Sequence, residues 1–416
     1  MRIPRIDDFD LYGKRVLLRV DINSPIDRST RAIVDDNRLT KSLPTIRDLA
    51  AAGARLVLIA HQGDTLDYHN LVSLRGHASR LGDLLGRSVR FIDDVAGPAA
   101  RQAVRDLGIG EILLLENLRF LTEEVSTFES AVKLTPTEMV ETYLVRSLAP
   151  LFDLYVNDAF AAAHRNAPSM VAFQEVLPTA GGRLLMEEID ALSSVAEHPA
   201  RPCLFLLGGL KISDAFGMMR KVLADGIADE VLTAGITGQI MLMAGGIRLG
   251  EPSERFIADR SLDAFVPEAV ALLEQFPDHI RVPRDVAYDQ DGTRREMAVA
   301  DLPAPAAIVD IGEVTIDAYR QSIAGAATIF VNGPAGVYES AVGDRGTREL
   351  WTAVAAARGV SVIGGGDTVA SARRFVDLDH IGFVSTGGGA LIRYLSGQRL
   401  PLLEAMRRAA ERPAML

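Results

Sequence analysis

Short apolar runs alternate with helix-like patterns along most of the chain. The expected strands lie at residues 15–20, 55–60, 111–115, 154–156, 203–207, 230–232, 307–309, 328–331, 360–363 and 382–384. Runs of this length without polar alternation are typical of strands buried on both faces. After the first strand, Leu39, Leu43, Ile46 and Leu49 share one helical face, and Gly53 follows as a C-terminal cap. This alternation predicts an α/β fold of doubly wound, largely parallel sheets.

Polar segments follow the expected strands. They read VDIN, AHQGD, LENLRF, VNDAF, LGGLK, VNGPAG, IGGGDT and VSTGGGA. In open α/β sheets, ligands bind beyond the carboxyl ends of the strands. The chemistry of this chain is therefore expected on one side of its sheets.

The two halves carry different chemistry at these ends. The first presents basic side chains at Arg19, Arg38, His61, Arg119, His164 and Arg165. The second presents glycine clusters at 208–209, 364–366 and 387–389. The first half suits an anionic small molecule, whereas the second suits phosphates held by backbone N–H groups. Residues 183–197 form a long amphipathic pattern that is expected to join the halves as a helix.

Two glycine-rich turns are candidate phosphate sites. Gly364, Gly365 and Gly366 precede Asp367, Thr368 and a helical pattern, where helix N–H groups can bind a phosphate and Asp367 can hold Mg²⁺. The alternative is a tight turn with a capping residue. A second candidate cradle comprises Ser385, Thr386, Gly387 and Gly388; its alternative is close helix–strand packing. Neither turn matches a Walker A motif or the GxGxxG fingerprint.

Further candidates follow two other strands. Lys211, one of only 5 Lys against 39 Arg, comes after Gly208-Gly209 and can act as a point charge on a phosphoryl group. Asn332 begins the NGPAG turn, and Glu339 can accept hydrogen bonds from ribose hydroxyls. A solvated side chain is the alternative for both Lys211 and Glu339.

Composition narrows the class of protein. The net charge of −11 argues against a general nucleic-acid binder, and the single cysteine excludes an intramolecular disulfide. The N-terminal segment resembles no signal peptide, and the long uncharged runs are interrupted by Gly, Pro and polar residues. We expect a cytoplasmic protein with no nucleic-acid or membrane partner.

The ordered motifs resemble those of phosphoglycerate kinases. RVDIN, DDNRLTKSLPTI, AHQG, LLLENLRF, VNDAFAAAHR, LGGLKISD, VNGPAGVYE, GGGDT and STGGGA stand in that family's order, from about residue 12 to Pro401. The INSPID segment and the stretch between Leu121 and Leu151 are most similar to the archaeal-type branch. This resemblance implies a fold, a reaction and a set of site residues.

The resemblance implies two α/β domains facing a cleft and joined by a hinge helix. Residues 1–180 would bind phosphoglycerate, residues 181–385 the nucleotide, and residues 386–416 would return to the first domain. The implied reaction is reversible phosphoryl transfer between 1,3-bisphosphoglycerate with ADP and 3-phosphoglycerate with ATP, with Mg²⁺ as cofactor. The partners would be these small molecules. A monomer is expected, with a dimer as the alternative.

The resemblance also assigns roles to individual residues. Arg38 and Lys211 would neutralise the transferring phosphoryl group. The acid would be bound by Arg19, Asp21, Asn23, Arg38, His61, Arg119, His164 and Arg165. The nucleotide would be bound by Gly208, Gly209, Lys211, Asn332, Glu339, Gly365, Gly366, Asp367 and Thr368, with Asp367 holding the metal through the nucleotide. The nucleophile is a carboxylate that is already ionised at pH 7, so no catalytic base is needed.

Three positions depart from the family pattern. Asp64 replaces the Arg of HxGR and is expected to repel the distal phosphate of the substrate; Ala215 replaces a Lys, and Ala335 replaces a Met or similar residue. Asp64 keeps two alternatives to a phosphoglycerate kinase open. One is a paralogue that forms the acyl phosphate of another carboxylic acid. The other is a non-catalytic binding protein on the same fold.

Overall fold

The computed structural model describes residues 2–412, and these form two compact units. Residues up to 189, together with the segment from 399, make the first unit, and residues 190–398 make the second. Helix α8 (Arg183–Ala196), the expected joining helix, spans the boundary. The expected boundary at 180/181 thus lies nine residues before the observed one at 189/190.

The first unit is built on a six-stranded parallel sheet in the order β3-β4-β2-β1-β5-β6. Its strands are β1 (Arg15–Arg19), β2 (Arg55–Ile59), β3 (Arg90–Phe91), β4 (Ile112–Leu114), β5 (Leu154–Asn157) and β6 (Thr179–Gly181). Its helices are α1 (Asn37–Ala51), α2 (Arg75–Leu85), α3 (Pro98–Arg105), α4 (Ser126–Val132), α5 (Pro136–Met139), α6 (Tyr143–Leu148), α7 (Pro168–Val171) and α17 (Pro401–Glu411). The strand order reverses direction between β1 and β5, which is the doubly wound topology.

Continuous apolar strands explain this arrangement. Val16, Leu17 and Leu18 of β1 are all fully buried, as expected for a central strand covered on both faces. The predicted apolar face of α1, including Leu39 and Ile46, packs into the same core. Gly53 follows α1 with φ +80°, a conformation that favours glycine at the end of a helix.

The second unit also has a six-stranded parallel sheet, with strands ordered β15-β14-β13-β7-β8-β9. They are β7 (Cys203–Leu207), β8 (Glu230–Thr233), β9 (Ile280–Arg281), β13 (Thr328–Asn332), β14 (Val360–Ile363) and β15 (Phe383–Val384). The helices are α9 (Ile212–Ala224), α10 (Gly235–Ala244), α11 (Glu251–Ala258), α12 (Val266–Gln275), α13 (Glu313–Gly325), α14 (Arg345–Ala356), α15 (Gly366–Phe375) and α16 (Gly388–Leu395). Here the reversal lies between β7 and β13. The predicted α/β class with two parallel sheets is confirmed.

A small antiparallel sheet was not expected. It consists of β10 (Asp285–Gln290), β11 (Thr293–Ala298) and β12 (Ile308–Ile311), in the order β11-β10-β12. The strand expected at 307–309 corresponds to β12, but the prediction that it joins a parallel sheet is wrong. Strand β12 pairs antiparallel with β10 and lies outside the parallel sheet. Most side chains of β11 are exposed, so this strand carries no apolar run that would have revealed it.

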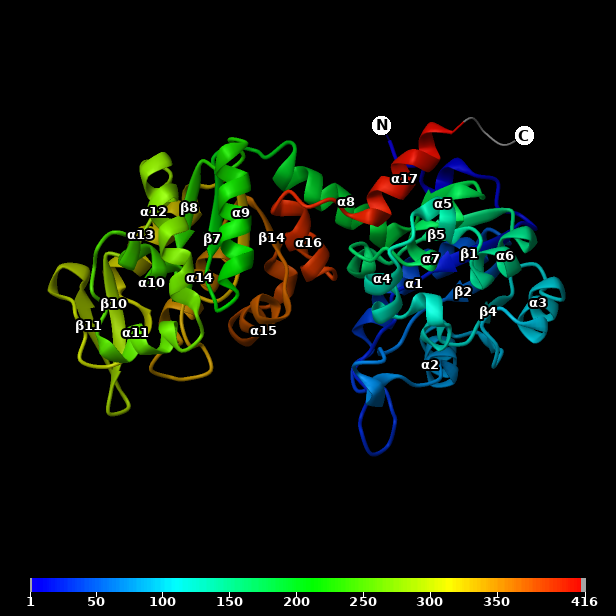
Figure 1. The fold of residues 1–416 in the computed structure, drawn as a ribbon, viewed down its shortest axis with the longest axis horizontal. Coiled ribbons are helices and arrows are strands. Elements are labelled where there is room, and N and C mark those ends of the chain that lie inside the picture. The colour runs from blue at the N-terminus through cyan, green and yellow to red at the C-terminus, as the bar shows by residue number, and fades with distance from the viewer. Residues whose placement is uncertain (1, 413–416) are drawn as a thin grey trace. The chain divides into compact units, whose positions relative to one another are not determined.

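The C-terminal return begins later than expected. Helix α16 packs on α9 within the second unit, so residues 386–398 do not belong to the returning segment. Helix α17 packs on α7 and β6 of the first unit, as Figure 1 shows at the red end of the chain. Residues 413–416 of the expected segment lie outside the described residues. Among the described helices, none has the length and apolar character needed to cross a lipid bilayer.

Candidate functional site

Arginine and histidine side chains meet beyond the ends of β1 and β2. Arg19 ends β1 and His61 follows β2; both are buried, and Arg19 Nη2 lies 2.8 Å from His61 Nδ1. Because a guanidinium has only donors, Nδ1 accepts and the ring proton of neutral His61 lies on Nε2. Burial, and then the charge of Arg19, hold the pKa of His61 well below its ordinary value. His61 is therefore a neutral hydrogen-bond donor.

The loop after β1 carries the next part of this site. Arg38, near the start of α1, forms an ion pair with Asp21. Asn23 Oδ1 accepts a hydrogen bond of 3.0 Å from the backbone N–H of Gly63, which joins this loop to the one after β2. The predicted acid-binding residues Asp21, Asn23 and Arg38 are thus brought to the switch point of the first sheet.

Arg119 and Arg165 meet at Asp64. Arg119 and the hydroxyl of Ser126 both donate to Asp64 Oδ2, and Arg165 Nη2 lies 3.8 Å from the same oxygen. The carboxylate is therefore paired with the arginines that were expected to bind the substrate. The sequence singled out Asp64 as a source of repulsion but gave no signal for Ser126. His164 lies half-buried next to Arg165 in the chain.

Arg19, Arg38, Arg119 and Arg165 are called the arginine cluster below. A buried acid, Glu124, lies near this cluster. Glu124 is buried and accepts hydrogen bonds from Ser169 N (2.6 Å) and Ser169 Oγ (2.7 Å). Its burial raises the pKa of Glu124 above the ordinary value, although these hydrogen bonds oppose the shift. Sequence patterns did not reveal Glu124, because an isolated Glu in a polar stretch usually lies on the surface.

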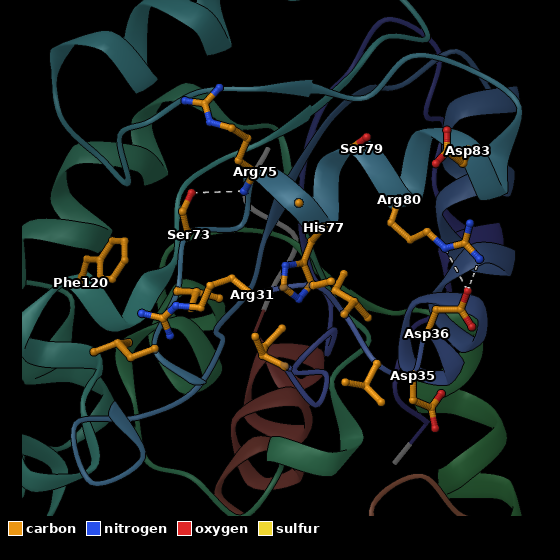
Figure 2. Close-up of a pocket in the computed structure, with 17 residues that line it drawn as sticks. Arg31, Asp35, Asp36, Ser73, Arg75, His77, Ser79, Arg80, Asp83 and Phe120 are labelled. Atoms are coloured by element: carbon orange, nitrogen blue, oxygen red, sulfur yellow. Dashed lines mark hydrogen bonds and ion pairs between the residues drawn. The ribbon is translucent and has the colours of Figure 1, made fainter. Parts of the chain in front are cut away.

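The first unit also has a cavity of about 1200 Å³, which lies beside the hairpin-like loop before α1 and the start of α2. No predicted acid-binding residue lines it. Figure 2 shows Arg80 turned to Asp36, with Nε 3.0 Å from the carboxylate. Arg75 lies 3.5 Å from Asp93, and Arg31 donates to the carbonyl of His69 at 2.6 Å. Arg80 thus pairs with an acid of the same cavity, and because the predicted acid-binding residues lie elsewhere, the arginine cluster is the candidate anion site.

In the second unit, the predicted nucleotide residues line one cavity of about 540 Å³. Its lining includes Gly208, Gly209, Lys211, Asn332, Glu339, Gly365, Gly366, Asp367 and Thr368. These residues come from the loops after β7, β13 and β14, which are neighbours in the sheet. The cavity therefore sits at the switch point of the second sheet, where such folds bind ligands.

Backbone atoms form much of this cavity. Gly208 N donates to Asn332 O at 2.8 Å, and Gly333 N donates to Thr368 Oγ1 at 2.9 Å. A Cβ at Gly208 would lie 2.3 Å from Pro334 O, and one at Gly333 would lie 2.3 Å from Gly208 O. Gly333 also has φ +88°. Glycine is required here because two turns approach at backbone distance.

Lys211 and Asp367 face each other at the open side of this cavity. Lys211 Nζ lies 3.5 Å from Asp367 Oδ2, and both side chains are largely exposed. One carboxylate at a helix start beside a phosphate-sized turn fits Mg²⁺, which binds to few carboxylates when phosphates supply other ligands. Within residues 2–412, no group of three or more metal-ligating side chains occurs. A metal at Asp367 would thus depend on nucleotide phosphates.

The far end of the cavity is apolar. Leu242 of α10, Phe256 of α11, Val286 and Ile308 of the small antiparallel sheet, and Pro283 of the loop before β10 line it. Such a wall suits a planar ring system. Sequence reasoning missed these residues, because apolar side chains of a binding wall look the same as core residues in a single sequence.

The predicted phosphate cradle lies behind the cavity. Ser385, Thr386, Gly387 and Gly388 do not line it. Gly388 packs against the neighbouring turn, because a Cβ there would lie 2.5 Å from Gly365 N. Ser385 Oγ accepts from Gly387 N at 3.1 Å. These contacts are those expected of close turn packing, and the role of the four residues as a cradle stays a prediction.

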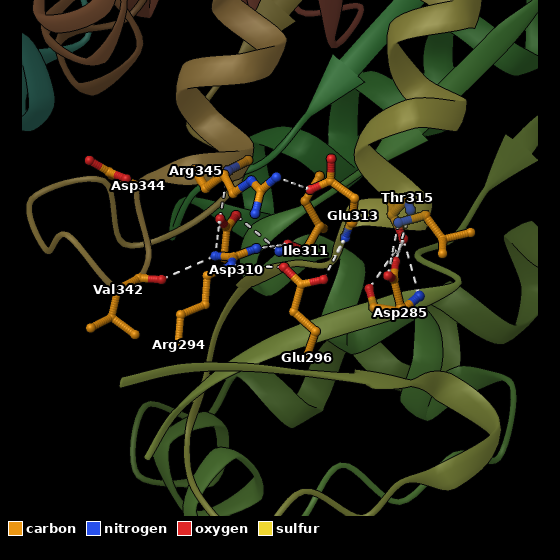
Figure 3. Close-up of polar contacts among 12 residues, drawn as sticks. Asp285, Arg294, Glu296, Asp310, Ile311, Glu313, Thr315, Val342, Asp344 and Arg345 are labelled. Atoms are coloured by element: carbon orange, nitrogen blue, oxygen red, sulfur yellow. Dashed lines mark hydrogen bonds and ion pairs between the residues drawn. The ribbon is translucent and has the colours of Figure 1, made fainter. Parts of the chain in front are cut away.

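A buried ion pair links Asp310 of β12 to Arg294 of β11 (Figure 3). Asp310 Oδ2 lies 2.9 Å from Arg294 Nη1 of β11 and accepts from Gly346 N at 2.6 Å. Arg294 also donates to Val342 O at 3.0 Å and to Ile311 O at 2.7 Å. Burial raises the pKa of Asp310 to about 6, although Gly346 and Arg294 oppose the shift. This network ties the small sheet to the loop between β13 and α14.

The other two departures from the family pattern are buried alanines. Ala215 lies fully buried in α9, and Ala335 lines the cavity while its N–H donates to Thr347 Oγ1 at 3.1 Å. A long side chain at either place would need a different packing. The substitutions thus agree with their surroundings in this protein.

Comparison with known proteins agrees with this arrangement. The family model described as phosphoglycerate kinase matches residues 6–398. The chain is 42% identical to the phosphoglycerate kinase of Methanothermobacter thermautotrophicus over 405 residues, covering 97% of each chain. It is 41% identical to that of Natronomonas pharaonis over 406 residues, covering 97% of this chain and 100% of the relative.

Solved structures give the same result. The crystal structure of phosphoglycerate kinase from Pyrococcus horikoshii OT3 has a TM-score of 0.85 and 36% identity, covering 98% of this chain and 99% of that one. The structure of phosphoglycerate kinase from Coxiella burnetii has a TM-score of 0.84 and 28% identity, covering 99% and 100%. The comparisons give no support to a kinase for another acid or to a non-catalytic protein. The chain belongs to the phosphoglycerate kinase family.

Proposed function

We propose that this protein catalyses the reversible transfer of a phosphoryl group between 1,3-bisphosphoglycerate with Mg-ADP and 3-phosphoglycerate with Mg-ATP. The observation that carries the proposal is the cavity of the second unit, which all nine predicted nucleotide-binding residues line. The arginine cluster of the first unit supplies the complementary half, a site for an acid that carries both a carboxylate and a phosphate.

Each half of the site has a distinct task. Arg119 and Arg165 bind the phosphate of the acid, and His61 donates to it or to the hydroxyl from Nε2. Asp21 and Asn23 orient the hydroxyl group. In the second unit, the N–H groups at the start of α15 hold nucleotide phosphates, the apolar wall holds the base, and Glu339 binds ribose. Mg²⁺, held by Asp367 together with the phosphates, supplies positive charge when bound.

The chemical step depends on alignment and charge. The carboxylate of 3-phosphoglycerate is the nucleophile and is ionised at pH 7, so no side chain needs to remove a proton from it. Arg38 and Lys211 neutralise the charge of the phosphoryl group in transfer. The acid and the nucleotide must meet for transfer to occur, and the proposal includes a closing motion that brings them together and excludes water.

A coupled assay tests this function. Purified protein is mixed with 3-phosphoglycerate and Mg-ATP, and the acyl phosphate is consumed by a linked dehydrogenase. We expect turnover that requires both substrates and is lost when Mg²⁺ is removed by a chelator. Absence of turnover in a protein that still binds Mg-ATP by calorimetry would contradict the assignment of the acid. Absence of both turnover and binding would contradict the assignment of the cavity.

A further inference from the structure

Asp64 occupies the centre of the proposed phosphate site. Its Oδ2 accepts from Arg119 and from Ser126 Oγ and lies 3.8 Å from Arg165 Nη2. Arg165 also donates to Ser126 Oγ, and Arg119 Nη1 lies 3.2 Å from that hydroxyl. Two donors that suit a phosphate group therefore meet at one carboxylate oxygen of the protein itself, and Arg165 lies beside it while pairing with Glu129 at 3.2 Å.

The carboxylate is charged in this setting. Burial alone would raise its pKa, but the hydrogen bond from Ser126 and the charge of Arg119 outweigh that effect and hold the pKa of Asp64 below its ordinary value. Arg119 is buried, with a side chain only 3% exposed. Without an anion beside it, this guanidinium would be an uncompensated buried charge, which is costly. Asp64 therefore stabilises the arginines while no phosphate is present.

Asp64 is the partner that can move. It begins an exposed loop that carries Leu66 and Tyr68, whose side chains are 85% and 75% exposed. The preceding Gly63 is fixed, with φ +67° and the backbone of Asn70 where its Cβ would be. Rotation about the side-chain bonds of Asp64 takes its carboxylate to water, whereas Arg119 is enclosed by the fold. Release breaks the hydrogen bonds that Asp64 Oδ1 accepts from Thr65 N (2.6 Å) and Thr65 Oγ1 (3.1 Å), but both of these donors are on an exposed residue that water can reach.

We propose that Asp64 is an internal competitor of the substrate phosphate: it holds Arg119 and Arg165 in place, and the incoming phosphate group displaces it. This inference rests on the proposed function, which supplies the phosphorylated acid. A phosphate carries up to two charges and three acceptor oxygens, so it gains more from these donors than a carboxylate does. A ligand with a single charge gains too little to displace Asp64. The competition therefore lowers the affinity for ligands that place a phosphate at Arg119 and Arg165, whereas a ligand that leaves these arginines alone avoids it.

Calorimetry on Asp64→Asn tests the competition. The natural protein and the variant are titrated, without nucleotide, with 3-phosphoglycerate, with inorganic phosphate and with glycerate. We expect Asp64→Asn to bind 3-phosphoglycerate about tenfold more tightly, because a charge-assisted contact no longer has to be broken. Inorganic phosphate should gain by a similar factor. Glycerate has no phosphate that could displace Asp64, so its affinity should change by less than about twofold.

The same loop offers a matched control. Asp67→Asn removes one negative charge three residues away, where the carboxylate accepts from Asn70 Nδ2 at 2.8 Å and does not contact the arginines described above. We expect less than about a twofold change in 3-phosphoglycerate affinity, since the charges are exposed and screened. Asp64→Ser, a second neutral variant, repeats the test if Asp64→Asn folds poorly in a thermal melt.

The outcomes separate this inference from the proposed function. Weaker phosphate binding by both neutral variants would overturn the inference, since Asp64 would then be needed to position Arg119. An affinity equal to that of Asp67→Asn would overturn it as well. If the natural protein shows no turnover of 3-phosphoglycerate while Asp64→Asn still gains affinity for inorganic phosphate, the competition stands and the substrate assignment fails.

Discussion

The two units are each built on a six-stranded parallel sheet, but their ligand sites consist of different chemical groups. In the first unit, the site consists of long side chains that are already paired with acids, as Arg38 is with Asp21 and Arg119 with Asp64. In the second, the cavity is formed largely by backbone, where glycines allow turns to approach within hydrogen-bond distance. Parallel sheets therefore support two ways of recognising a ligand, one through side chains and one through backbone. A single substitution should affect the two sites differently.

The largest effect should come from removing a cation next to the reacting group. We expect Arg38→Ala and Lys211→Ala each to lower kcat by about 10²–10³-fold, because each removes a charge that stabilises the transition state. Lys221→Ala is the control, since Lys221 pairs with Asp225 on the surface of α9 and lies outside the cavity lining. Initial rates in the coupled assay measure the effect. If KM rises while kcat stays unchanged, the residue contributes to substrate binding and not to the chemical step.

Breaking the support of the second site should cost stability in that unit alone. Arg294→Met leaves Asp310, whose side chain is fully buried, without its cationic partner. We expect a loss of about 3 kcal/mol at pH 8, measured by hydrogen exchange at amides of β13. Asp317→Asn, at an exposed position of α13, should change it little. Equal losses in β5 of the first unit would show that the units do not unfold separately.

The backbone-built site should also be sensitive to one added methyl group. Gly208→Ala places a Cβ 2.3 Å from Pro334 O, so the paired turns must separate. We expect a cost of about 2 kcal/mol, which weakens Mg-ADP binding about thirtyfold and leaves 3-phosphoglycerate binding unchanged. Gly325→Ala, where nothing lies within 4 Å of a new Cβ, is the control. Calorimetry with Mg-ADP and with 3-phosphoglycerate measures both affinities. An unchanged affinity for Mg-ADP would mean that the Gly208 turn is not part of the nucleotide site.

The sequence predicted these two sites to different extents. The glycine turns after β7, β13 and β14 were found because glycine and polar residues after an apolar strand are a local signal. The partners of the arginines were not: Ser126 and Glu124 meet Arg119 and Arg19 only through the fold. Whether Asp64 repels the substrate phosphate or pairs with the arginines depends on its neighbours in the fold. The spacing of residues along the sequence does not reveal these neighbours. Likewise β11 lacks an apolar run, so the small sheet went unpredicted.

The smallest effect should come from a buried acid that has a backbone partner in place of an arginine. Asp158 follows β5, is fully buried, and accepts from Leu185 N at 2.9 Å. Burial raises its pKa to about 7 from an ordinary value of 3.8, although hydrogen bonds oppose the shift. Native Asp158 therefore binds a proton more tightly than the unfolded chain does. Its contribution to stability is present below pH 4 and is lost as the pH rises through about 7.

Asp158→Asn should remove this pH dependence. At pH 8 we expect a gain on the order of 1 kcal/mol in the first unit, because each unit of pKa shift corresponds to about 1.4 kcal/mol and the amide oxygen accepts a weaker hydrogen bond from Leu185. Below pH 5 the gain should vanish. Hydrogen exchange at amides of β5 measures it, with Asp93→Asn, at an exposed position, as control. A loss at pH 8 would mean that the charged carboxylate stabilises the first unit.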